Sequence, residues 1–179
     1  MSPFGIRSSV SHYTIDASGW SYSVMPEHIS FPVFATITLG RLKKGYLYHE
    51  ALRHMNVLFG NSAEEILPKV TCLETRRDVD LVVVTPANVG LKVADHCDRF
   101  LAVAAEAGLE LCPAEVGPSL LISQQPDAWL HVAMEPIANH LGLPVRFELG
   151  LMWGRKCIST GNRSFVGADD RWVFVQPRA

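Results

Sequence analysis

Residues 109–137 (LELCPAEVGPSLLISQQPDAWLHVAMEPI) separate two different patterns in this chain. The part before them alternates between strand-like and helix-like stretches, whereas the part after them consists of short strand-like runs joined by turn residues. The segment itself places polar side chains among apolar neighbours, so it is the first place to search for a functional site. Nothing in it has the spacing of a known catalytic motif.

The composition is that of an ordinary globular protein. Of the 179 residues, 48% are hydrophobic and 19% are charged, and 16 Lys and Arg nearly balance 18 Asp and Glu. This balance does not create the positive field that holds nucleic acid or an anionic membrane, so we expect neither as a partner. The nearest approach to a basic patch is Arg41, Lys43 and Lys44, a group more typical of a solvated turn.

The cysteines, the N-terminal sequence and the lack of a long apolar run indicate the cellular compartment of the protein. Cys72, Cys97, Cys112 and Cys157 form no CxxC pair and no small secreted framework, which favours buried thiols in a reducing environment. The N-terminus lacks the pattern of a secretory signal, and no apolar run approaches the roughly 20 residues of a membrane helix. We therefore expect a cytoplasmic protein.

The first part of the chain predicts a sheet with two main helices. Residues 1–30 are rich in Ser and predict a poorly structured arm, with a short hairpin as the alternative. Residues 31–39 alternate as a strand, residues 46–59 carry one apolar stripe as a helix, and residues 80–85 are apolar throughout, as in a central strand. The other predicted elements here are a short helix at 62–67, a helix at 93–107 and strands at 69–73 and 109–112.

The second part predicts an antiparallel meander. Its strands are expected at 120–123, 129–135, 145–153, 156–160 and 171–176, with turns between them. The predicted fold class is therefore α+β, with a mixed, mostly antiparallel sheet of about six to eight strands, two main helices and a C-terminal β-meander. Residues 31–179 are expected to form a single domain.

Three polar residues of the opening segment make a candidate catalytic group. If residues 129–135 form a strand, His131 and Glu135 lie on one face about 7 Å apart, and Glu115 comes from the preceding segment. A histidine with two carboxylates suits general acid–base chemistry. The alternative interpretation is that these side chains form the solvent-facing side of a half-covered sheet.

A binding surface is the other candidate, and a metal site is not expected. Trp129 and the turn residue Gln125 would supply contacts for a ligand, because aromatic residues on a sheet face can form stacking platforms. The run Asp95-His96-Cys97-Asp98 resembles a metal site, but neighbours on a helix do not share a face. No cofactor motif is present.

The sequence also resembles a family of uncharacterised short soluble bacterial proteins. The resemblance rests on LELCPAEVGP at 109–118, on Gln125-Pro126, Trp129 and AMEPI at 133–137, and on the closing RWVFVQPR at 171–178. It implies a bacterial, cytoplasmic, single-domain protein. The family has no established activity, so the resemblance assigns no catalytic or binding residue.

These observations leave the function open between two hypotheses. The first is a small interaction or regulatory module that binds a protein or a small molecule through the sheet and loops around residues 114–135. The second is a small hydrolase or transferase that uses His131 with Glu115 or Glu135. A pocket enclosing those three groups would favour the enzyme, and a flat or convex surface would favour the binding module.

Overall fold

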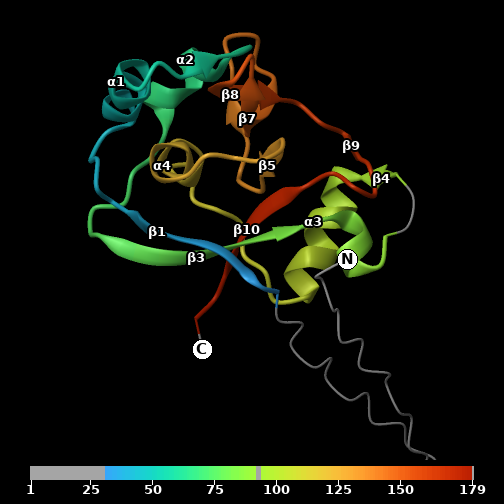
Figure 1. Cartoon of the computed structure of the whole chain (residues 1–179). Helices are drawn as coiled ribbons and strands as arrows, with labels where there is room; N and C mark the ends of the chain where they lie inside the picture. The colour runs from blue at the N-terminus through green and yellow to red at the C-terminus, as the bar shows by residue number, and fades with distance from the viewer. Residues whose placement is uncertain (1–30, 92–93, 179) are drawn as a thin grey trace, which may run out of the picture.

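One mixed sheet of eight strands organises the part of the chain that this computed structural model describes, residues 31–91 and 94–178 (Figure 1). The strand order is β1-β3-β10-β5-β7-β8-β2, and β6 pairs with β7. The strands are β1 (Val33–Leu39), β2 (Leu58–Phe59), β3 (Arg77–Val84), β5 (Leu130–Val132), β6 (Ile137–Ala138), β7 (Pro144–Met152), β8 (Arg155–Gly161) and β10 (Trp172–Gln176). A second sheet pairs β4 (Asp95–His96) with β9 (Phe165–Val166).

The helices are short. They are α1 (Gly45–His54), α2 (Ala63–Ile66), α3 (Cys97–Glu106) and α4 (Val116–Ser123), with 3₁₀ turns at Leu67–Lys69 and Pro86–Val89. Within the described ranges, no helix has both the length and the apolar character to cross a membrane. The predicted arm at residues 1–30 lies outside these ranges.

The strand pairing confirms the predicted fold class. In the described sheet, β10 runs parallel to β5 and β2 runs parallel to β8, whereas the other neighbouring pairs are antiparallel. The strands β5, β7 and β8 form the expected antiparallel run. The last strand, β10, then returns to the middle of the sheet between β3 and β5.

Each face of the sheet carries its own hydrophobic core, because successive side chains of β10 point to opposite faces. Val173 and Val175 belong to the first core, which also contains buried side chains of α1 and α4. Trp172 and Phe174 belong to the second core, where Phe100 of α3 packs edge-on against both rings. The side chain of a residue in a central strand therefore points to the face opposite to the core that its two sequence neighbours belong to.

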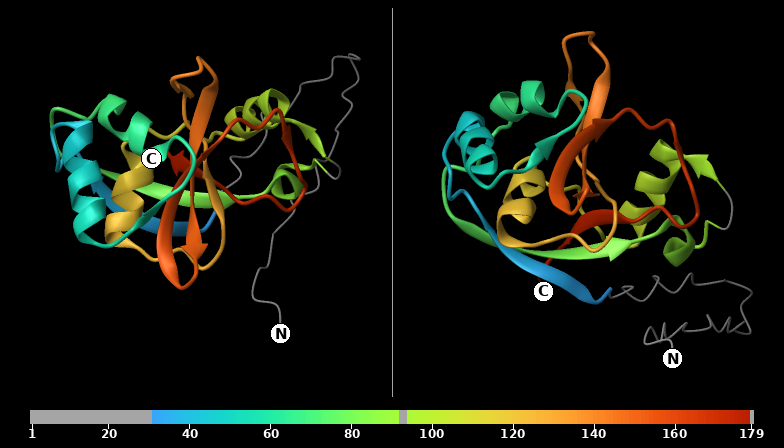
Figure 2. Two further views of the ribbon diagram at one scale, coloured as in Figure 1. Left: turned by 90° about the horizontal axis from the view of Figure 1, so that it is seen from above. Right: turned by 45° about the horizontal axis from the view of Figure 1, so that its top comes forward.

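The helix α4 corrects the strand predicted at residues 120–123. Six of its eight residues, from Val116 to Leu121, are buried. It contacts β1 near one edge of the sheet and β7 and β8 near the other, and Figure 2 shows the sheet curving around it. A helix that is covered on all sides is apolar on all sides, so it shows no helical period and resembles a buried strand.

Smaller differences have local causes. The helix α1 ends at His54 instead of residue 59, because Asn56 adopts a left-handed φ of 58° and the chain turns into β2. Residues 69–73 form no strand, since the 3₁₀ turn at Leu67–Lys69 is followed by an irregular segment. The strand expected at residues 109–112 is reduced to two isolated bridges, through Glu110 and Cys112.

Candidate functional site

His131 is buried in the middle of the sheet, on the face of the second core. Its neighbours Leu130 and Val132 belong to the first core, so alternation turns the imidazole to the other side. There the imidazole ring packs against the indole of Trp172, with ring centroids 4.9 Å apart, and only 5% of the residue is exposed. His131 is therefore not part of a solvent-facing surface.

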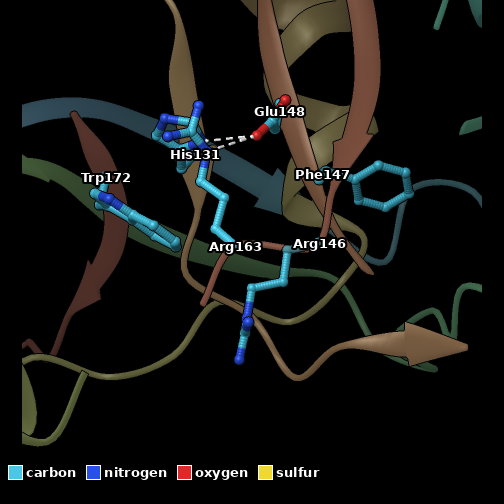
Figure 3. Close-up of a pocket in the computed structure, with 7 residues that line it drawn as sticks. His131, Arg146, Phe147, Glu148, Arg163 and Trp172 are labelled. Carbon is cyan, nitrogen blue, oxygen red and sulfur yellow. Dashed lines mark hydrogen bonds and ion pairs between the residues drawn. The ribbon is translucent and has the colours of Figure 1, made fainter. Parts of the chain in front are cut away.

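The carboxylate beside His131 is that of Glu148, which the sequence analysis did not single out. Glu148 lies opposite His131 in the β5–β7 pair, and its Oε1 is 3.2 Å from His131 Nδ1. Arg163 Nε donates to the same oxygen at 3.1 Å, and Figure 3 shows both side chains directed toward it. Hydrogen bonding from His131, and then from Arg163, holds the pKa of Glu148 below its usual value despite burial.

Gly161 makes room for this carboxylate. A Cβ atom at Gly161 would overlap Glu148 Oε1, so the position has no space for a side chain. On the outer side of Arg163, its NH1 group donates to Asp170 Oδ2 at 3.2 Å. The result is a chain of paired polar side chains, from His131 through Glu148 and Arg163 to Asp170, that links β5, β7 and the loop before β10.

The hollow at this site is small. Besides His131 and Glu148 it is lined by Arg146, Phe147, Gly161, Arg163 and Trp172 (Figure 3). Its enclosed volume is about 10 Å³, roughly what one water molecule needs. In this conformation it cannot enclose a substrate molecule beside His131.

Glu115 lies on the other face of the sheet and acts as a structural clamp. Its neighbour Val116 is in the first core, and the residue has no exposed surface. Its Oε1 accepts from the backbone N–H of Gly40 at 2.6 Å, and its Oε2 accepts from that of Leu73 at 3.1 Å. These bonds tie the start of α4 to the end of β1 and to the segment before β3. The structure thus does not bring Glu115 to His131.

Glu135, Gln125 and Trp129 are all exposed, but they differ in surroundings. Glu135 follows β5, and its side chain makes no hydrogen bond or ion pair to any described residue. Gln125 lies in the connection between α4 and β5. Trp129 is 40% exposed, and its indole lies directly over the Cα of Gly150 in β7, where a Cβ would overlap it.

The tip of the β7–β8 hairpin is a candidate site that was not predicted from the sequence. Trp153 and Gly154 form its two-residue turn with φ values of 51° and 74°. Two positive φ angles are typical of the turn that matches the twist of a hairpin, where Asn-Gly is the favoured pair. Trp153 is 86% exposed. The sequence feature that could have predicted this site is the Trp-Gly pair between two strand-like runs. A small polar residue such as Asn is the usual residue before the glycine of such a turn.

In the part of the chain that the structure describes, no group of three or more His, Cys, Asp or Glu side chains is placed to hold a metal ion. Asp95 Oδ2 instead pairs with NH1 of Arg99 at 2.8 Å, four residues further along. Comparisons with models of protein families, with curated proteins and with solved structures found no match for this chain. The resemblance to short bacterial proteins therefore stays a resemblance and assigns the chain to no family.

Proposed function

We propose that this protein is a small interaction module that binds a partner protein through its hairpin surface, defined as Trp129, Met152 and Trp153. The observation that carries this proposal is the 86% exposure of Trp153 at a positive φ angle. A bulky residue is rare in this backbone conformation and costs about 1–2 kcal/mol there. The exposed ring gains little packing within its own chain to offset that cost.

The geometry favours a protein over a small molecule as the partner. Trp129 covers Gly150, Met152 follows two residues later on the same face of β7, and Trp153 protrudes at the turn. These residues line neither the hollow beside His131 nor a second hollow between Asp80 and Arg178. A protruding tryptophan needs a partner that supplies the pocket, and tryptophans are frequent hot spots of protein interfaces.

The test is photo-crosslinking followed by a binding measurement. A photoreactive amino acid is placed at position 129 or 153 in cells that make the protein, and at position 141 as the control. Leu141 is a matched control because it is exposed and apolar but precedes β7, at the far end from the hairpin turn. The partner identified from adducts at 129 and 153 is then purified.

The purified partner should bind the Trp153→Ala variant about 30-fold or more weakly than the wild type, as expected for loss of about 2 kcal/mol or more at a hot spot. The Leu141→Ala variant should bind as the wild type does. Equal adducts at all three positions, or a partner that binds Trp153→Ala unchanged, would reject the proposal.

A second candidate function is acid–base catalysis by His131, as in a small hydrolase or transferase. The observation in its favour is the Glu148 carboxylate on Nδ1, which fixes the imidazole and leaves Nε2 for proton transfer. Glu148 takes the place beside His131 that was predicted for Glu115 or Glu135. Ester hydrolysis that is lost in both His131→Gln and Glu148→Gln, but not in His54→Gln, would support it.

We also propose a bacterial origin and a cytoplasmic location. All four cysteines are free in the structure, three of them buried. Free thiols are typical of a reducing compartment. The resemblance to short bacterial proteins points the same way.

A further inference from the structure

The first residue of β8 places a positive charge beside the hairpin surface. Arg155 lies directly opposite Met152 in the β7–β8 pair, and the side chains of opposite residues share one face of a sheet. A single residue, Gly154, separates Arg155 from Trp153. Arg155 therefore adjoins two of the residues that define the hairpin surface.

The guanidinium of Arg155 is held in place by Asn56, which carries no charge. Its Nε and Nη2 atoms donate to the backbone oxygen of Asn56 at 3.1 and 2.7 Å, and Nη2 also donates to the Asn56 side-chain oxygen. None of the ion pairs among the described residues includes Arg155. Its Nη1 group, which has two N–H donors, makes no hydrogen bond to a described residue, so it is available to a partner.

The hairpin has no negative charge that could balance Arg155. Residues 149–161 contain two cations, Arg155 and Lys156, and no Asp or Glu. Lys156 points to the opposite face of the sheet, because successive side chains of a strand alternate. In the connection before β5, the carboxylate of Asp127 is paired with Arg171 at 3.1 Å. The hairpin surface thus combines exposed apolar side chains with an adjoining positive charge.

We propose that the partner of the hairpin surface is a different protein that presents an Asp or Glu carboxylate beside the pocket that takes Trp153, and that this carboxylate binds the guanidinium of Arg155. The inference rests on the proposed interaction function and adds the chemistry of the partner. Interfaces juxtapose opposite charges, and arginine and tryptophan are both enriched among their hot spots. The carboxylate accepts from Nη1, while Asn56 keeps the guanidinium fixed.

The experiment uses the full-length protein and the partner isolated through crosslinks at positions 129 and 153, with affinity measured by calorimetry over a series of sodium chloride concentrations. Arg155→Gln should weaken binding about 10-fold. Arg155→Lys, which retains the charge but not the planar fork, should weaken it less. Wild-type binding should weaken as salt rises, because salt screens exposed charge pairs. Arg155→Gln should lose most of this salt dependence, a result that a purely structural role beside Asn56 would not produce.

Arg99→Gln is the matched control, because it removes the same charge from an exposed arginine on α3 that pairs with Asp95. It should bind as the wild type does and keep the salt dependence. If Arg155→Gln does not fold, Arg155→Lys and the salt dependence of the wild type still decide.

Four results would overturn the inference but leave the interaction module in place, provided that Trp153→Ala still weakens binding. They are unchanged binding in both Arg155 variants, a wild-type affinity independent of salt, a partner that is a second copy of this chain, and binding that is lost when the partner is treated with phosphatase. If positions 129 and 153 give no more adducts than position 141, the proposed function itself fails, and this inference fails with it.

Discussion

Glu115 is a buried carboxylate whose two oxygens both accept from backbone N–H groups, those of Gly40 and Leu73. Leaving a buried donor without its acceptor costs about 1–3 kcal/mol. We therefore expect Glu115→Ala to lower the free energy of unfolding by about 2–5 kcal/mol, measured by urea denaturation. Glu110→Ala, a change at an exposed residue of the same segment, should alter it by less than about 0.5 kcal/mol. Equal effects would show that Glu115 is not a clamp.

Cys72 lies beside the buried Glu115 carboxylate, and the reactivity of the Cys72 thiol tests this arrangement. Burial, and then the negative charge of Glu115, raises the pKa of the Cys72 thiol to about 11. At pH 8 only about one thiol in a thousand is then ionised, and the thiolate is the reactive form. We expect alkylation by iodoacetamide, followed by mass spectrometry, to be roughly 100-fold slower than for an unfolded control. An alkylation rate of Cys72 equal to that in the unfolded protein would show that the thiol is not buried beside Glu115.

The sequence identified the unusual polar residues but not their partners. The pattern in residues 129–135 singled out His131, and the position of Glu115 among apolar residues marked it as special. The partners of these residues are brought near only by the fold: Glu148 is across the sheet, and Gly40 is 75 residues from Glu115. Gly161 is required only because the Glu148 carboxylate occupies the space of its side chain.

At the scale of elements, the turn of the β7–β8 hairpin contains Trp153, an exposed residue that is unfavourable at a positive φ angle. We expect Trp153→Asn to raise the free energy of unfolding by about 1 kcal/mol, because Asn tolerates the left-handed conformation better than Trp. The replaced ring is 86% exposed, so little packing is lost. Thermal unfolding measures the gain, and the partner's affinity should fall as it does for Trp153→Ala. A decrease in stability would show that Trp153 supports the hairpin itself.

The link between β5, β7 and the loop before β10 should weaken in acid. Hydrogen bonds from His131 and Arg163 lower the pKa of Glu148 in the folded state. The Glu148 carboxylate therefore contributes its full stabilisation at pH values above its unfolded pKa of about 4.3. The contribution is lost as pH falls from about 5 through the folded pKa. In urea denaturation at a series of pH values, wild type and Glu148→Gln should differ by a constant amount above pH 5 and converge below it. Arg163→Gln, which removes one donor, should lie between them.

The helix α4 shows what an element-level pattern cannot predict. Its sequence VGPSLLIS is mostly apolar, and the period that separates helix from strand is absent when six of the eight residues are buried. Pro118 falls within the first turn of the helix, where a backbone N–H has no partner inside the helix. Gly117 and Pro118 therefore lie at the beginning of a helix, just before the residues predicted as a strand.

For the molecule as a whole, the sequence predicted the kinds of elements better than their order in space. The α+β class and the antiparallel run of β5, β7 and β8 followed from local alternation. The insertion of β10 between β3 and β5 did not, because it depends on pairing Trp172–Gln176 with residues about 90 positions earlier. Neighbouring strands in a meander are adjacent in the sequence, whereas β10 is adjacent in the sequence to neither β3 nor β5.

This insertion makes β3 and β10 members of both cores, and we propose on that basis that residues 31–179 fold as one domain. Leu120→Ala in the first core and Phe100→Ala in the second should each lower the free energy of unfolding by about 3–4 kcal/mol. Because the cores share two strands, each variant should still unfold in a single transition, with near-UV and far-UV circular dichroism coincident. A separate early transition in Phe100→Ala alone would mean that α3 and its core unfold independently of the rest of the sheet.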